Sequence, residues 1–232
     1  MRRRAKSSRC GGMILSIVLS AALAAGCSEA AADRDLTSPK AAALTFARAI
    51  DRGDADTARF AAMSGGIEND LLDAMALAVP ALRKLDATAR AKWSAAGGAL
   101  VRRSSTGSSS TSNNPLDTVK MLTEGDVAIL GDGTLAQISS RDAANSLQLK
   151  KIDGQWKVDV GAMIKGQDVT QTIPWLRALA STANSVAAQI EAGSVSTVDE
   201  AQQAMGREIV QNLREARAAR NATTQTTRMA SQ

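Results

Sequence analysis

The residues best suited to acid–base chemistry in this chain are two pairs of aspartates near predicted turns. Asp126 and Asp132 lie across one predicted turn, and Asp153 and Asp159 flank Trp156. Two carboxylates at such spacing could serve as the acid and base of a glycoside-cleaving site. Aspartate is also favoured in turns, where its side chain accepts backbone hydrogen bonds. We interpret both pairs as turn residues and predict no catalytic role for them.

Other catalytic chemistry lacks the necessary residue types. The sequence contains no His and no Tyr, which excludes histidine-based triads, histidine metal sites and phenolic acid–base catalysis. The serine-rich segment 104–112 therefore has no histidine to activate a nucleophile. We predict that the protein is not an enzyme and that it needs no metal and no cofactor.

The positive charge of the chain is concentrated at its start. The 232 residues have a formal net charge of +5, but residues 1–27 contain five basic residues and no acidic one. The remainder holds 23 basic and 23 acidic residues and is formally neutral. Because a nucleic-acid-binding protein needs a basic surface, we predict no nucleic-acid partner.

The first 27 residues are typical of an export signal. A basic segment at 1–9 is followed by the apolar run Met13–Ala25, whose 13 residues are too few to span a bilayer as a helix. The run ends in Leu23-Ala24-Ala25-Gly26-Cys27, which resembles the lipobox of bacterial lipoproteins, with Ala24 where Leu is commoner. The resemblance implies cleavage between Gly26 and Cys27, and attachment of acyl chains (such as palmitate) to Cys27.

Lipidation would place the mature protein on the periplasmic side of a cell-envelope membrane. Several acyl chains anchor a protein stably without a transmembrane helix. Ser28 after the cysteine resembles the pattern that sorts lipoproteins to the outer membrane, so we favour that membrane over the inner one. Residues 27–37 are polar and alanine-rich and are expected to be a tether. Cys10 would be removed with the signal peptide, which leaves Cys27 as the only thiol.

The rest of the chain predicts an α+β fold. Ser38-Pro39 begins a helix, Gly53-Asp54 separates it from a short second one, and a long third helix is expected over Ile67–Ala96. Pro80 should kink or split that helix, and Gly97-Gly98 should end it. Residues 103–115 are rich in serine and threonine and are expected to be a flexible loop.

After this loop the apolar residues alternate with a period of two, which predicts strands. Asp153-Gly154 is the strongest hairpin signal. The predicted strands are Val119–Thr123, Val127–Leu130, Thr134–Ser139, Ser146–Ile152 and Gln155–Val160.

Two C-terminal helices are predicted over residues 172–218. Ile173-Pro174-Trp175 opens the first helix, Gly193 ends it, and Thr197–Glu200 forms a capping box for the second. Residues 219–232 are polar and are expected to be a disordered tail.

Residues Phe46–Asp54 and Leu149–Asp159 resemble segments of the nuclear transport factor 2-like superfamily. The resemblance spans about residues 39–162 and implies N-terminal helices packed on a bent antiparallel sheet, together enclosing a cone-shaped cavity. Isomerases of that superfamily use a Tyr that this chain lacks. The resemblance therefore implies a fold for residues 38–165 and a pocket, and no reaction.

Two further groups of residues have both a structural and a functional interpretation. Lys150, Lys151, Lys157 and Lys165 could bind anionic headgroups or cell-wall polymers, but we interpret them as protection of an edge strand. Trp93, Trp156 and Trp175 could line a pocket, but in so aromatic-poor a chain we expect them to fill the core.

Three functions remain open at this point. The leading hypothesis is a non-enzymatic binding or structural module anchored by lipid. The second is a small-molecule binder or enzyme that uses the conical cavity. The third is an envelope protein that binds a partner protein through its C-terminal helices.

Overall fold

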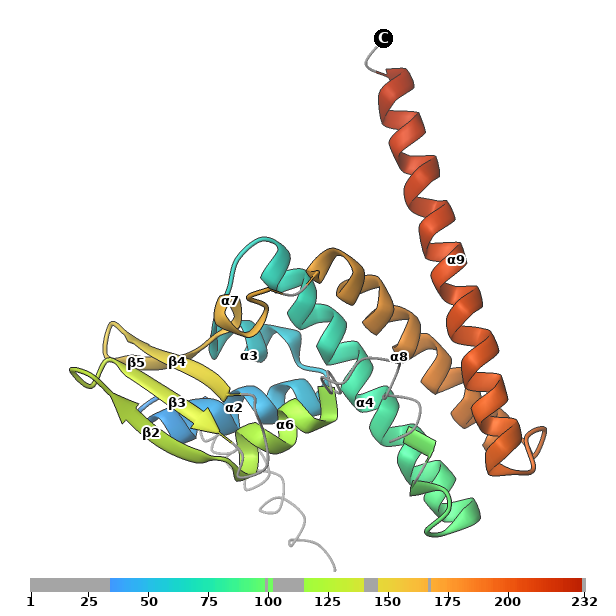
Figure 1. The fold of residues 1–232 in the computed structure, drawn as a ribbon, viewed down its shortest axis with the longest axis horizontal. Coiled ribbons are helices and arrows are strands. Elements are labelled where there is room, and N and C mark those ends of the chain that lie inside the picture. The colour runs from blue at the N-terminus through green and yellow to red at the C-terminus, as the bar shows by residue number, and fades with distance from the viewer. Residues whose placement is uncertain (1–33, 99, 102–114, 140–145, 167, 231–232) are drawn as a thin grey trace, which may run out of the picture. The chain divides into compact units, whose positions relative to one another are not determined.

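The computed structural model describes residues 34–98, 100–101, 115–139, 146–166 and 168–230, which form an α+β fold as the sequence predicts (Figure 1). The described residues from Asp35 onward belong to a single unit. Its elements are, in order, α2 (Pro39–Arg52), α3 (Ala55–Phe60), β1 (Ala62–Met63), α4 (Ile67–Trp93), α6 (Pro115–Glu124), β2 (Asp126–Leu130), β3 (Leu135–Ser139), β4 (Ser146–Ile152), β5 (Gln155–Asp159), α7 (Val160–Met163), α8 (Val169–Glu191) and α9 (Val198–Ala230).

The first helices begin and end where the capping residues predict. The hydroxyl of Ser38 accepts a hydrogen bond from the N–H of Ala41 at the start of α2. Gly53 ends α2 with a φ of 75°, a conformation that glycine adopts without strain. The carboxylate of Asp54 then accepts from the N–H of Thr57 and caps α3.

The long helix α4 differs from the prediction at its end. It continues through Pro80 as one helix and stops at Trp93, before the predicted end at Ala96. Ser94 has a φ of 53°, and the chain then turns back so tightly that a Cβ on Gly97 would lie 2.1 Å from the carbonyl oxygen of Ala89. Gly97 is therefore required by a close backbone approach after the helix.

The segment Val119–Thr123, predicted to be a strand, is part of helix α6 instead. Pro115 suits a helix start, and Leu116, Val119 and Leu122 recur at helical spacing; Val119 and Leu122 are buried. The ammonium of Lys40 in α2 donates to the carbonyls of Thr123 and Gly125 at the end of α6. The alternation seen in the sequence was too short to distinguish the two periods.

The five strands form one mixed sheet in the order β1-β5-β4-β3-β2. Strands β2 to β5 are antiparallel neighbours, as predicted, whereas the two-residue β1 adds a parallel pair with β5 that the sequence did not predict. Asp153 and Gly154 join β4 to β5 with φ values of 49° and 80°. Positive φ at both central residues is the geometry that Asp-Gly favours in a two-residue hairpin.

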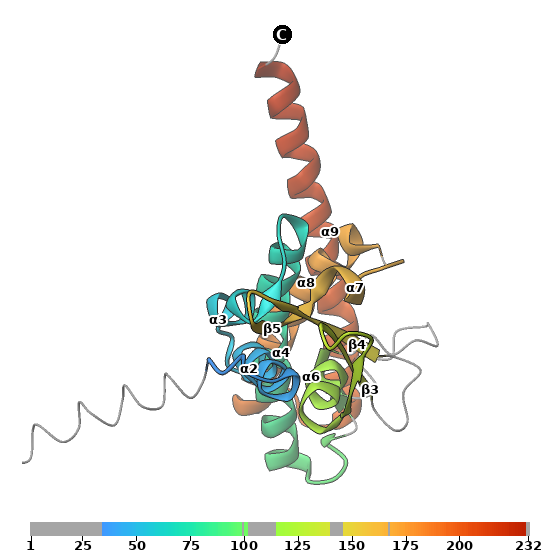
Figure 2. The same cartoon turned by 90° about the vertical axis from the view of Figure 1, so that its left-hand side faces the viewer.

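One face of the sheet forms the core of the α+β part. Helices α2 and α6 lie against β5 and β3 (Figures 1 and 2), and the core is completed by Phe46 and Ile50 of α2. The sheet residues buried there are Ala136, Ile138, Leu147, Leu149, Trp156 and Val158. Trp156 is 4% exposed, so its predicted place in the core is confirmed.

The C-terminal helix pair is present, but its boundaries differ from the prediction. Helix α8 begins at Val169 and contains Pro174 in its second turn, because the residues before Ile173 already bond to the carbonyl of Asp168. Helix α8 packs along α4, so the pair is not separate from the preceding fold.

The last helix begins as predicted and ends much later. The hydroxyl of Thr197 accepts from the N–H of Glu200, and the Glu200 carboxylate accepts from the N–H groups of Ser196 and Thr197. Helix α9 then continues to Ala230, past the predicted end at 218, and extends beyond α8 (Figure 1). No Gly or Pro follows Gly206 in this helix to stop it, so the helical structure of 219–230 corrects the predicted disordered tail.

The burial of Trp156 generates a stability prediction. Replacing Trp156 by Ala in the chain without residues 1–27 should lower the free energy of unfolding by about 3–5 kcal/mol, because a large cavity opens in the core. Trp156→Phe should cost much less. Trp175→Ala is the matched control, since that ring is only half-buried and packs at the core margin. Thermal and denaturant melts that show a smaller loss for Trp156→Ala than for Trp175→Ala would contradict this role.

Candidate functional sites

The predicted lipidation site lies outside the described residues. Neither Gly26 nor Cys27 is placed, and the same holds for residues 103–114 of the predicted loop. Among the described residues, no helix is long and apolar enough to cross a membrane.

The first described residues are fixed firmly to the fold, which defines where the predicted tether ends. The hydroxyl of Thr45 donates to the Asp35 carbonyl at 3.0 Å, and the buried Leu36 accepts from the backbone N–H of Trp156 at 2.9 Å. The Thr37 hydroxyl and N–H both donate to the Asp35 carboxylate and lower the pKa of that group. The chain is therefore held against β5 from residue 35 onward.

The structure does not assemble the two predicted aspartate pairs into sites. Asp132 lies in the exposed β2–β3 turn, where the hydroxyl and N–H of Thr134 donate to its carboxylate and lower its pKa. Asp153 forms the β4–β5 turn, while Asp159 is at the far end of β5. The interpretation of Asp132 and Asp153 as turn residues is confirmed.

Asp159 belongs to a different polar cluster, which the sequence did not predict. Its buried carboxylate accepts from the N–H of Ala162 at the start of α7 and pairs with the ammonium of Lys150 at 2.6 Å. A side chain on Gly161 would meet both the Asp159 and the Glu68 carboxylates, at 3.4 and 3.1 Å. Three charged groups thus gather at the end of β5.

The geometry of this cluster favours a structural role. The Asp159 oxygens already bind one ammonium and one helix N-terminus, so the carboxylate is not available as a base. In the described part of the chain, no three or more acidic, His or Cys residues gather in a way that could hold a metal ion. The cluster links β4, β5 and α7, and the Glu68 carboxylate of α4, which accepts from the N–H of Gly65, lies near it.

Lys150 and Lys151 do not protect an edge strand, which corrects their predicted role, because β4 is interior to the sheet. Lys157 lies on β5 just before the two residues that β1 pairs, and Lys165 follows α7 and lies in no strand. Lys150 pairs with Asp159, whereas Lys151 and Lys157 lie over the rings of Trp156 and Phe60, 6.0 and 5.8 Å from the ring centres. Each of these cations is thus paired locally by a carboxylate or an aromatic face.

The three tryptophans all contact the core but differ in how deeply they are buried. Trp156 is buried, while Trp93 and Trp175 are half-buried and pack against the core from its margin. The indole N–H of Trp93 donates to the carbonyl of Ser196 at 3.0 Å and so holds the α8–α9 connection against the end of α4. These contacts are structural.

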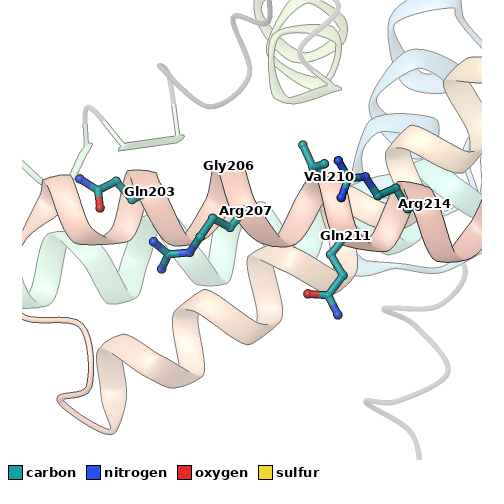
Figure 3. Close-up of a pocket in the computed structure, with 6 residues that line it drawn as sticks. All are labelled: Gln203, Gly206, Arg207, Val210, Gln211 and Arg214. Carbon is teal, nitrogen blue, oxygen red and sulfur yellow. The ribbon is translucent and has the colours of Figure 1, made fainter.

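Figure 3 shows a hollow along helix α9. All the residues that line it come from this one helix, and Val210 is 45% exposed there. They form a stripe on the side opposite to the buried Ala201, Ala204 and Met205, and two of them are arginines. The lining residues are Gln203, Gly206, Arg207, Val210, Gln211 and Arg214. A hollow open to solvent and lined by one helix lacks the enclosure of a small-molecule site.

Comparison with known proteins adds no relative: no family model, no curated protein and no solved structure matches the chain. The lipobox and the likeness to the nuclear transport factor 2-like superfamily therefore stay predictions from the sequence.

The Lys150–Asp159 pair generates a second prediction. Lys150→Met should lower the free energy of unfolding by about 1–3 kcal/mol, because it leaves a buried carboxylate without its cation. In the double variant Lys150→Met/Asp159→Asn, the losses should be less than additive, since the two groups are in contact. Lys120→Met is the matched control: its pair with Glu124 spans 3.9 Å with both side chains 68% exposed, and its loss should stay below about 1 kcal/mol. Additive losses at Lys150 and Asp159 would show that the pair does not act as a unit.

Proposed function

We propose that this chain is a bacterial lipoprotein whose folded unit is held at the periplasmic surface of a cell-envelope membrane as a binding or structural module. The observation that carries the proposal is the order of a basic segment, a 13-residue apolar run and Leu23–Cys27. Cys27 is the anchoring residue, and cleavage falls between Gly26 and Cys27. The outer membrane is favoured over the inner one by Ser28.

The position at which the fold begins supports this proposal. Asp35 is fixed by Thr45, and Leu36 is buried against Trp156, so only a short segment separates Cys27 from the folded unit. Asp35 is eight residues after Cys27, and eight extended residues reach at most about 29 Å. An acylated Cys27 would therefore hold the folded unit at the membrane surface.

The absence of His and Tyr and the use of Asp159 as a cap favour a module without catalysis. The alternative, a small-molecule binder or enzyme with a conical cavity, gains less support. The core face of β3, β4 and β5 is occupied by buried apolar side chains and by the Trp156 ring, wherever the structure describes it.

Lipidation is tested by a substitution. Cys27→Ala should leave unprocessed precursor or move the protein into the soluble fraction, because both cleavage and acylation require the thiol. Cys10→Ala is the matched control and should leave processing and membrane association unchanged, since that residue is removed with the signal. The readouts are mobility of the pulse-labelled protein and its distribution between membrane and soluble fractions. Normal processing and membrane association of Cys27→Ala would contradict the proposal.

A further inference from the structure

The end of the sheet where β2 meets β3 and β4 meets β5 exposes three large apolar side chains on the face opposite the core. Leu130, Leu135 and Ile152 are 36–40% exposed, whereas Ile129, which is 62% exposed, pairs with the buried Ala136 and so lies on the other face. We call Leu130, Leu135 and Ile152 the hairpin-tip patch. Scattered apolar residues on a surface are ordinary, whereas a group at one end of a sheet marks a contact surface.

Strand register shows that these residues are neighbours. Leu130 pairs with Leu135 across β2 and β3, and Leu135 pairs with Lys150 of β4. The N–H of Lys151 donates to the carbonyl of Thr134, which joins the two hairpins next to Ile152. The patch therefore spans both hairpin tips, which lie at the same end of the sheet in Figure 1.

The folded chain begins at this same end. Leu36 bonds to the N–H of Trp156, which pairs with Lys151 and lies two residues after the Asp153–Gly154 turn. The start of α2 lies beside the hairpin tips in Figure 1. An anchor on Cys27, at most about 29 Å of chain from Asp35, would therefore pull this end of the sheet toward the bilayer.

We propose that the hairpin-tip patch rests on the lipid bilayer and sets the orientation of the domain on the membrane. This proposal rests on the proposed lipid anchor. The Leu and Ile side chains enter the headgroup region. Lys150 is paired with the buried Asp159, Lys151 lies over the Trp156 ring, and Asp132 and Asp153 lie in the two turns, so apolar contact, and not attraction to anionic lipid, carries the interaction.

The test places a label on single introduced cysteines in the full, lipidated protein reconstituted into phosphatidylethanolamine–phosphatidylglycerol vesicles. Leu130→Cys, Leu135→Cys and Ile152→Cys report on the patch, and Leu77→Cys, on the exposed side of α4, is the matched control because Leu77 is 57% exposed. Each variant carries an environment-sensitive fluorophore. Quenching is measured with iodide in water and with brominated acyl chains in the bilayer.

Labels on the patch should be quenched several-fold more by the brominated lipid than the label at Leu77, and several-fold less by iodide. The result should be unchanged in pure phosphatidylcholine vesicles. Iodide quenching equal to that at Leu77 would overturn the proposal. Protection from both quenchers would also overturn it, because a second copy of the chain would then cover the patch.

The wild-type protein separates this proposal from the one on which it rests. Its only cysteines are Cys10, in the removed signal, and Cys27, whose thiol is acylated, so it should take no label. Labelling of the wild type would contradict the lipid anchor and with it the orientation. Absence of labelling together with water-exposed patch residues would leave the anchor in place and refute the orientation alone.

Discussion

The hydrogen bond from the Trp156 N–H to the Leu36 carbonyl fixes the point at which the chain enters its fold. Through it the first described segment of the chain is fixed to β5, while the Trp156 ring fills the core face below. Leu36 is buried at the same place, and Thr45 of α2 holds the adjacent Asp35 carbonyl. The chain thus enters its fold at the end of the sheet that carries the hairpin tips. This contact therefore determines the point on the domain to which a lipid anchor on Cys27 would connect.

The outer face of the sheet is organised around charge. The two-residue Asp153–Gly154 turn sets Lys150 directly opposite Lys157, an unfavourable pairing of like charges. Asp159 offsets it by pairing with Lys150, and Lys157 lies over the ring of Phe60 in α3. The same carboxylate caps α7, so one buried acid fixes the end of β5 and the next helix. An acid with so many structural contacts has little freedom for chemistry.

The sequence predicted correctly those helix starts and turns that depend on a capping residue or on a residue that adopts positive φ. Ser38, Asp54 and the Thr197–Glu200 box cap helices as expected, and the positive φ that Asp153-Gly154 tolerates fixes one hairpin. The prediction of a strand at Val119–Thr123 was wrong because these five residues fit a strand and a helix equally well. The burial of Val119 and Leu122 against neighbouring elements favours the helix. The Lys150–Asp159 pair could have been predicted from the sequence. The two-residue turn sets the hairpin register, which places Lys150 opposite Lys157 and therefore near Asp159 on the same face. The position of Glu68 beside this pair depends on how α4 packs against the other helices, which no local pattern encodes.

The mass of the first tryptic peptide tests the proposal that the mature chain begins at an acylated Cys27. In protein extracted from membranes, that peptide should begin at Cys27 and exceed its calculated mass by a diacylglyceryl group, usually with a further acyl chain on the amino terminus. Fragmentation should place the added mass on residue 27. A first peptide that begins at any other residue, or an unmodified Cys27 in the membrane fraction, would contradict the proposed lipid anchor.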